Sequence, residues 1–233
     1  SKVLGIAGYK EQDSNGFGVG NHYLNLASRY GNPRIIMPWE EHVPVDLLIL
    51  PGGMDINPSS YGEIPQFNTS NQDVFKQFFF DKRLANYVEA QTPIFGICLG
   101  FQQLAAHFDS KITQHMPFHR QSTGRMTKGH DVRVTENIAL LGYKLTTKEE
   151  TLEVNSHHHQ GVLLENLSPE LLPLLVAANE EYGDVTIARH ETTLPQNIVE
   201  SFIHHNLPIA GCQYHPEEWN DWVSDALIKQ LLK

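Results

Sequence analysis

Apolar and polar positions along the chain follow two different periods, which predicts alternating strands and helices. Continuous apolar runs at residues 3–9, 34–38 and 45–53 are typical of strands buried on both faces of a parallel sheet. Residues 19–30 and 72–91 instead repeat their apolar positions at helical spacing. We therefore expect an α/β fold, doubly wound around a mixed, mainly parallel sheet.

The second half of the sequence is richer in short strand patterns, several of which alternate apolar with polar residues and predict an added antiparallel portion of the sheet. These patterns fall at residues 111–115, 130–135, 151–155, 174–178, 184–190, 197–203 and 208–214. The helical spacing in 72–91 selects an inner face of Val74, Phe78, Leu84, Ala85 and Val88, and that in 220–232 selects Trp222, Ala226, Leu227 and Leu231. No internal repeat or linker is evident, so we expect one domain over residues 1–233.

The segment PIFGICLGFQQLA, residues 93–105, reads as a strand, a sharp turn and a helix. Cys98 lies at the turn, with Gly96 and Gly100 two positions to each side. A nucleophile on such a turn needs small neighbours, and the N-terminus of the following helix favours the reactive thiolate. A lone cysteine in an apolar strand is more often a small core residue. The two flanking glycines shift the balance toward a nucleophile.

A partner base for this cysteine is offered by LPIAGCQYHPEE, residues 207–218, where a buried strand runs into His215, Pro216 and Glu217. Residues two apart in an extended segment project to the same side, and the proline makes that geometry more rigid. A carboxylate beside an imidazole orients the ring and stabilises its protonated form. Taken alone, His215 is better explained as a surface loop histidine, but the joint pattern is far more specific.

Charge and composition exclude several classes of protein. The formal net charge is -10 with histidine neutral, and no run rich in Lys or Arg occurs, so a nucleic acid is disfavoured as a ligand. No apolar run approaches the roughly 20 residues of a membrane span. The N-terminus also lacks a signal pattern, so we expect a protein of the cytoplasm. Two cysteines are too few for a disulfide framework, which fits a reduced compartment.

The chain has 13 histidines, which raises the question of a metal site. Three of them are adjacent, at His157, His158 and His159. Neighbouring residues on a strand point to opposite faces, so these three side chains are not arranged to hold one ion. We expect no metal and no cofactor.

The chain resembles the class I glutamine amidotransferase superfamily, and within it most resembles the cysteine hydrolases of the gamma-glutamyl-gamma-aminobutyrate hydrolase type. Four motifs carry this resemblance over nearly the whole chain: LPGGMDINPSSYGE (50–63), PIFGICLGFQQLA (93–105), VNSHHHQGV (154–162) and IAGCQYHPEEW (209–219). The second and fourth are highly specific for the superfamily, and the other two favour the hydrolase branch. The resemblance implies a flavodoxin-like fold.

The resemblance also implies a role for each residue that matches a family motif. The roles are Cys98 as nucleophile, His215 as general base and then acid, Glu217 as the group that orients His215, the backbone N–H groups of Gly53 and Leu99 as the oxyanion hole, and Gly52, Gln102 and His158 as residues near the glutamyl group. The implied reaction is cleavage of a γ-glutamyl amide, or of glutamine, through a glutamyl thioester.

Some positions depart from the hydrolase branch. Leu99 stands where that branch commonly has a basic residue, and residues 106–111 replace a usual pair of glycines. One alternative is therefore a glutaminase subunit that delivers ammonia to a separate synthetase chain. Sixteen residues follow Glu217, so we expect no fused synthetase domain. A second alternative is a non-catalytic binding module, against which the intact Cys98, His215 and Glu217 argue. A homodimer is compatible with the sequence.

Overall fold

The computed structural model describes residues 1–10, 16–53, 58–62, 74–113, 130–147, 150–155, 160–177 and 197–233. Its strands are β1 (Val3–Ala7), β2 (Tyr9–Lys10), β3 (Phe17–Gly18), β4 (Asn32–Ile36), β5 (Leu47–Leu50), β6 (Ile94–Ile97), β7 (His130–Val134), β8 (Thr151–Val154), β9 (Val162–Leu163), β10 (Leu171–Ala177), β11 (Ile198–His204) and β12 (Ile209–Cys212). Its α-helices are α1 (Asn21–Ser28), α2 (Val74–Lys82), α3 (Leu84–Glu89), α4 (Leu99–His107) and α5 (Trp222–Leu231). Short 3-10 helices span Pro58–Tyr61, Glu136–Leu141 and Leu164–Asn166.

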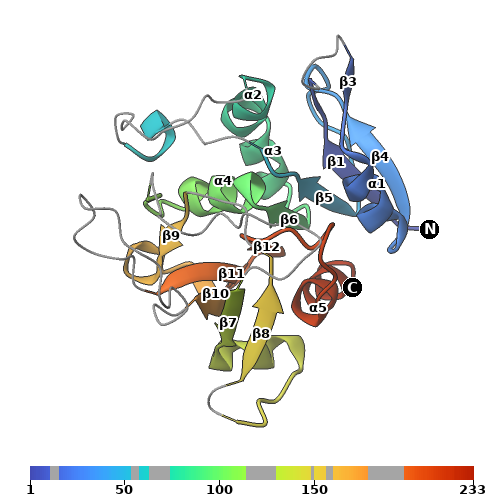
Figure 1. Cartoon of the computed structure of the whole chain (residues 1–233). Helices are drawn as coiled ribbons and strands as arrows, with labels where there is room; N and C mark the ends of the chain where they lie inside the picture. The colour runs from blue at the N-terminus through green and yellow to red at the C-terminus, as the bar shows by residue number, and fades with distance from the viewer. Residues whose placement is uncertain are drawn as a thin grey trace.

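One sheet contains all the described strands except β2 and β3, which pair with each other. Its order is β4-β1-β5-β6-β12-β11-β10-β7-β8, with β9 paired to β11 (Figure 1). The strands from β4 to β12 run parallel, and those from β11 to β8 continue the sheet antiparallel. The expected mixed, mainly parallel sheet with an antiparallel portion is confirmed. That the whole chain forms a single domain stays a prediction.

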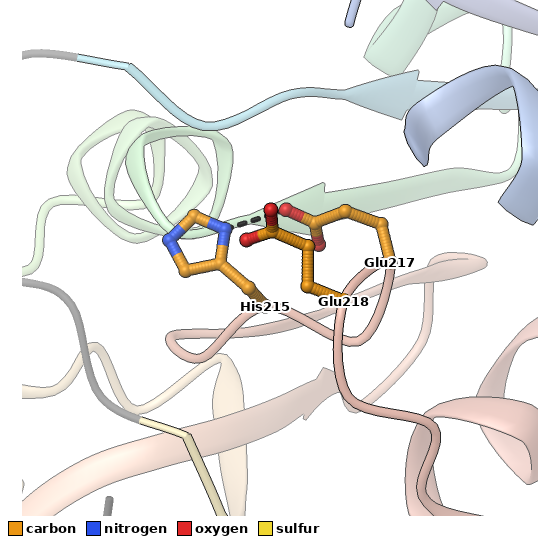
Figure 2. A group of neighbouring side chains, drawn as sticks. All are labelled: His215, Glu217 and Glu218. Atoms are coloured by element: carbon orange, nitrogen blue, oxygen red, sulfur yellow. Dashed lines mark hydrogen bonds and ion pairs between the residues drawn. The ribbon is translucent and has the colours of Figure 1, made fainter. Parts of the chain in front are cut away.

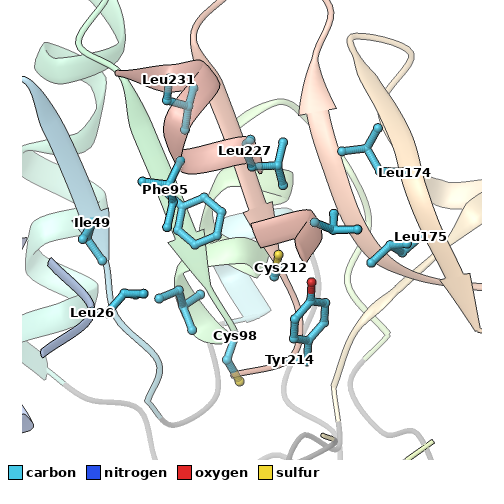
Figure 3. Close-up of a cluster of buried hydrophobic side chains, with 14 of the residues drawn as sticks. Leu26, Ile49, Phe95, Cys98, Leu174, Leu175, Cys212, Tyr214, Leu227 and Leu231 are labelled. Atoms are coloured by element: carbon cyan, nitrogen blue, oxygen red, sulfur yellow. The ribbon is translucent and has the colours of Figure 1, made fainter. Parts of the chain in front are cut away.

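Helices cover both faces of the parallel part of the sheet. Strand β5 shows why, because successive side chains on a strand point to opposite faces. Leu47 and Ile49 pack in a core cluster with residues of α1 and α5, part of which Figure 3 draws. Leu48 and Leu50 pack in a second cluster with residues of α2, α3 and α4. This layering confirms the doubly wound α/β arrangement.

The single helix expected at residues 72–91 is wrong in one respect, because the described part of it forms two helices. Arg83, with φ -118°, separates α2 from α3 and breaks the continuous helical spacing that the prediction assumed. Val74 is 74% exposed and Phe78 is 38% exposed, and Ala85 is exposed too, although all three were expected to face inward. The other two expected positions are confirmed, because Leu84 is buried and Val88 packs against the second core cluster. The buried face is completed by Lys76, Phe79 and Tyr87.

Two other expectations about elements need correction, and one cannot be compared. Residues 111–113 form no strand, and Thr113 makes only an isolated bridge to Gly161. In α5, Leu227 and Leu231 are buried as expected, and Trp222 packs partly buried against the first core cluster. Ala226 is only partly buried, whereas Val223 and Ile228, which were not expected to face inward, lie in the core. The strand expected at 184–190 lies outside the described residues. Among the described helices, none is long and apolar enough to cross a lipid bilayer.

Candidate active site

Cys98 lies at the turn between β6 and α4, in a strained backbone conformation. Its φ is 52° and its ψ is -103°, a region that residues with a side chain rarely adopt. Such strain persists only where surrounding structure holds it, and it is concentrated at functional sites. Cys98 lies at the margin of the first core cluster, with its sulfur directed away from the other side chains drawn (Figure 3).

The glycines on each side of Cys98 are required by close packing of backbones. A Cβ added to Gly96 would lie 2.6 Å from the carbonyl oxygen of Gly100. A Cβ added to Gly100 would contact the carbonyl oxygen of Leu50 on β5. The spacing of small residues in the sequence therefore reflects the tight contact of α4 with β5 and β6.

His215 and Glu217 follow strand β12 and form a buried hydrogen-bonded pair. The distance between Nδ1 of His215 and Oε1 of Glu217 is 2.6 Å, and the two residues are 2% and 9% exposed. Figure 2 shows the imidazole and the carboxyl groups of Glu217 and Glu218 converging on one point. A hydrogen bond at Nδ1 leaves Nε2 as the ring nitrogen for proton transfer.

The sheet brings this pair to Cys98 across 117 positions of sequence. Strands β6 and β12 are parallel neighbours in register, with Ile97 opposite Cys212, so the segments that follow them leave the same edge side by side. A Cβ added to Gly52 would lie 3.0 Å from Cε1 of His215 and 3.4 Å from Cβ of Cys98. The thiol, the imidazole and the loop after β5 thus meet at one place.

The pKa of the His215 imidazole reflects its contacts with Glu217 and Cys98. Burial lowers the pKa of His215, but the charges of Glu217 and Cys98 and their hydrogen bonds to the ring outweigh it and raise the pKa to about 10. The imidazole is therefore poised to carry a proton at neutral pH.

The loop after β5 is held by two side chains at Gly52. The N–H of Gly52 donates to the hydroxyl of Tyr23, at 2.9 Å, and the carbonyl of Gly52 accepts from the ammonium of Lys76. A Cβ added to the next residue, Gly53, would lie 3.0 Å from Cδ2 of Leu99. Leu99 is the first residue of α4, so its N–H belongs to the group of helix N–H donors that lack an intrahelical acceptor. The loop therefore lies against the side chain of the first residue of α4. That the N–H groups of Gly53 and Leu99 form an oxyanion hole stays a prediction.

The side chain of Gln102 is buried rather than exposed to solvent. Its amide nitrogen donates to the carbonyl of Gln160, at 3.1 Å, and to Oε1 of Gln213, at 3.2 Å. The amide nitrogen of Gln213 in turn lies 3.7 Å from Sγ of Cys98. Contact of Gln102 with a glutamyl group stays a prediction. His158, with His157 and His159, lies outside the described residues.

Sequence reasoning missed several residues of this site. Asn155 holds the backbone of His215 at both ends: Oδ1 accepts from its N–H at 2.8 Å, and Nδ2 donates to its carbonyl at 3.1 Å. Asn155 and Gln213 lie within the quoted motifs, but neither ionises, so no chemical signal drew attention to them. Tyr23 and Lys76 lie in helical patterns where the sequence offered no signal at all.

His215, Glu217 and Glu218 are also a group whose possible ligand atoms lie within 4.8 Å of one another, among the described residues. The geometry of the pair argues against a metal between the imidazole and Glu217. Zinc binds nitrogen and oxygen at about 2.0–2.2 Å in tetrahedral geometry, which separates two ligand atoms by about 3.4 Å, so atoms 2.6 Å apart would have to move to bind one ion together. The pair is built as a hydrogen bond.

Solved structures show the class of fold. One, described as a GMP synthase subunit from Thermoplasma acidophilum, matches with a TM-score of 0.58 and 17% identity over 99% of this chain and 92% of that one. The structure of PurLQS from Thermotoga maritima matches with a TM-score of 0.61 and 14% identity, over 99% and 97% of the two chains. These likenesses confirm the flavodoxin-like fold of the class I glutamine amidotransferases.

The family follows from the sequence match. The model of the Peptidase C26 family matches residues 41–217, and the chain belongs to that family. A glutamine amidotransferase-like protein of Lactococcus lactis, YvdE, is 32% identical over 154 residues, which cover 60% of this chain. That match spans 63% of YvdE. Anthranilate synthase component 2 of Thermococcus kodakarensis is 28% identical over 150 residues, 63% of this chain and 62% of that protein.

Proposed function

We propose that this protein is a cysteine-dependent hydrolase that cleaves a γ-glutamyl amide bond through a glutamyl thioester. The observation that carries the proposal is the strained Cys98 at the start of α4, brought by the sheet to the buried pair of His215 and Glu217. Membership of Peptidase C26 and the glutamine amidotransferase-like relatives support an enzyme of the hydrolase and amidotransferase class.

In the first half of the reaction, the Cys98 thiolate attacks the carbonyl carbon of the γ-amide. The negative charge that develops on the carbonyl oxygen is stabilised by the N–H groups of Gly53 and Leu99, and each such donor contributes on the order of 10²–10³ in rate. His215, held by Glu217, gives its proton to the leaving amine as the C–N bond breaks. A glutamyl thioester on Cys98 remains.

In the second half, a water molecule attacks the thioester carbon. His215 takes a proton from the water, the same oxyanion donors stabilise the intermediate, and the C–S bond breaks to restore the thiolate. The products are glutamate and an amine, or ammonia when the substrate is glutamine. The glutamyl group is assigned from the motif resemblance, with Gly52, Gln102 and His158 as the residues proposed to contact it.

The test is a substrate panel combined with cysteine variants. Glutamine, γ-glutamyl-γ-aminobutyrate, γ-glutamylated polyamines and folate polyglutamates are assayed for released glutamate. We expect Cys98→Ala to abolish turnover with the fold intact, because it removes the nucleophile, and His215→Asn to be nearly as damaging. Cys212→Ala, which changes the other cysteine, is the matched control and should retain turnover. Undiminished glutamate release by Cys98→Ala would refute the proposal.

A second candidate is the glutaminase component of a two-chain amidotransferase. Leu99 follows the amidotransferase pattern, and two of the similar proteins are described as part of GMP synthase and as a component of anthranilate synthase. This candidate predicts that free glutamine is hydrolysed only after a synthetase chain is added. Efficient release of glutamate by the isolated protein from a γ-glutamyl amine would favour the hydrolase instead.

A further inference from the structure

A buried lysine lies beside the loop that carries the proposed oxyanion donor. Lys76, on α2, is 7% exposed, and its ammonium group donates a hydrogen bond to the carbonyl of Gly52. The same ammonium lies 4.0 Å from the centre of the Tyr9 ring, within the range of a cation–π contact. Burying an ammonium is unfavourable unless such partners compensate for the lost water. The position of Lys76 is therefore a specific feature of this site.

The carbonyl that Lys76 binds belongs to the same peptide unit as the N–H of Gly53. A peptide bond is planar and trans, so its carbonyl and its N–H point in opposite directions. Fixing the Gly52 carbonyl toward Lys76 therefore fixes the Gly53 N–H away from it. This matters because a peptide between two glycines has few steric limits on its rotation. Without an anchor, the plane of this peptide is free to turn.

The charge of Lys76 adds to its effect on orientation. A hydrogen bond from a cation is stronger than one from a neutral donor. It also polarises the peptide, because hydrogen bonds in a chain strengthen one another. The N–H of Gly53 consequently becomes a better donor to a negative oxygen on its other side.

Lys76 is itself held relative to the nucleophile. Its backbone carbonyl accepts a hydrogen bond of 3.2 Å from the side chain of Gln103, on the helix that begins directly after Cys98. The approach of the lysine also depends on a glycine, because a Cβ added to Gly53 would lie 2.5 Å from Nζ of Lys76. Helix α2, helix α4 and the glycine loop thus form one connected unit.

We propose that Lys76 is a positioning residue, which orients and polarises the peptide between Gly52 and Gly53 so that the Gly53 N–H serves as an oxyanion donor. The inference rests on the proposed function, since it assigns Gly53 to the oxyanion hole. It adds a residue on α2 to the site.

The test compares two reactions of Cys98 that differ in their need for an oxyanion hole. With p-nitrophenyl acetate, the thiolate attacks a carbonyl, an oxyanion forms, and p-nitrophenolate leaves as an acetyl thioester is made. With iodoacetamide, the thiolate displaces iodide from carbon and no oxyanion forms. The rate of each reaction in Cys98→Ala is subtracted as background. The rate constant with p-nitrophenyl acetate divided by that with iodoacetamide then measures the contribution of the oxyanion hole separately from thiol reactivity.

We expect Lys76→Met to lower this ratio at least tenfold, toward the roughly 10²–10³ that loss of a whole donor produces. Lys82→Met, a matched change at an exposed lysine of the same helix, should leave the ratio as in the unaltered protein. Lys76→Gln keeps a donor but removes the charge, so a smaller fall is expected. This variant also carries the test if thermal melting shows that Lys76→Met does not fold.

A ratio in Lys76→Met and Lys76→Gln within twofold of the unaltered protein overturns the inference. An equal fall in Lys82→Met also overturns it, because the effect would then be one of general charge. Neither reagent is a γ-glutamyl compound, so the two proposals fail separately. One further outcome is that the unaltered protein cleaves no γ-glutamyl amide, while Lys76→Met still lowers the ratio of the two rate constants. That result would contradict the proposed substrate and support the role of Lys76.

Discussion

At the scale of single residues, the protonation of His215 is governed by its contacts rather than by its burial. Burial alone lowers the pKa of the imidazole, yet Glu217 and Cys98 raise it to about 10. Asn155, directly after β8, fixes the backbone of the same residue. The proposed acid and base is thus set in position and in charge by one neighbour, Glu217, and by two residues distant in sequence, Cys98 and Asn155.

This balance predicts the effect of Glu217→Gln. Removing the carboxylate removes the largest influence that raises the pKa of His215, so that pKa falls. The imidazolium that protonates the leaving amine then loses its proton at a lower pH. The alkaline limb of the plot of kcat/KM against pH therefore shifts to lower pH. The rate near neutral pH should fall on the order of 10²-fold. The pH profile of glutamate release measures both effects.

The control for this prediction is Glu218→Gln, which changes the neighbouring carboxyl group and leaves the pair of His215 and Glu217 in place. Its alkaline limb should stay where it is in the unaltered protein. An unmoved limb in Glu217→Gln would mean that the carboxylate does not determine the charge of His215.

At the scale of elements, the turn at Cys98 depends on how closely α4 approaches β5 and β6. Gly96 and Gly100 face each other across this contact, where a single methyl group would overlap backbone atoms. The glycine pattern was readable from the sequence because the turn is local. The division of the preceding helix into α2 and α3 was not, because the break at Arg83 carries no glycine or proline signal.

We expect Gly96→Ala to lower the free energy of unfolding by about 1–3 kcal/mol, because backbone atoms must shift to admit the methyl group. Denaturant titration of the free energy of unfolding is the measurement. Gly20→Ala is the matched control: its φ is -61°, and the nearest atoms to an added Cβ lie 3.6 Å away. If both variants lost a similar amount of unfolding free energy, the close packing at the Cys98 turn would not be the cause.

At the scale of the whole molecule, the sheet separates the two cysteines into different environments. Cys98 lies at the end of β6 and is 6% exposed, whereas Cys212 lies in β12, between β6 and β11, and is 0% exposed. Burial, followed by the charge of Asp221, raises the pKa of Cys212 well above the ordinary range of a thiol. Only one of the two thiols is therefore expected to react in the folded protein.

Alkylation with iodoacetamide tests this expectation. Mass spectrometry should find Cys98 modified first in the native protein, and Cys212 modified only as denaturant unfolds the sheet, since a central strand is reached only by global opening. Modification of the two cysteines at equal rates without denaturant would contradict the described burial.

The sequence by itself determined the alternation of strands and helices, the glycine-flanked turn at Cys98, and the spacing of His215 and Glu217. Each of these depends on residues close together along the chain, where periodicity and local sterics suffice. Only the tertiary structure decided that Asn155 holds His215, that Gln213 reaches the sulfur and that Lys76 binds the glycine loop. These contacts join residues 60, 115 and 24 positions apart, and their geometry is set by strand order and helix packing rather than by neighbours.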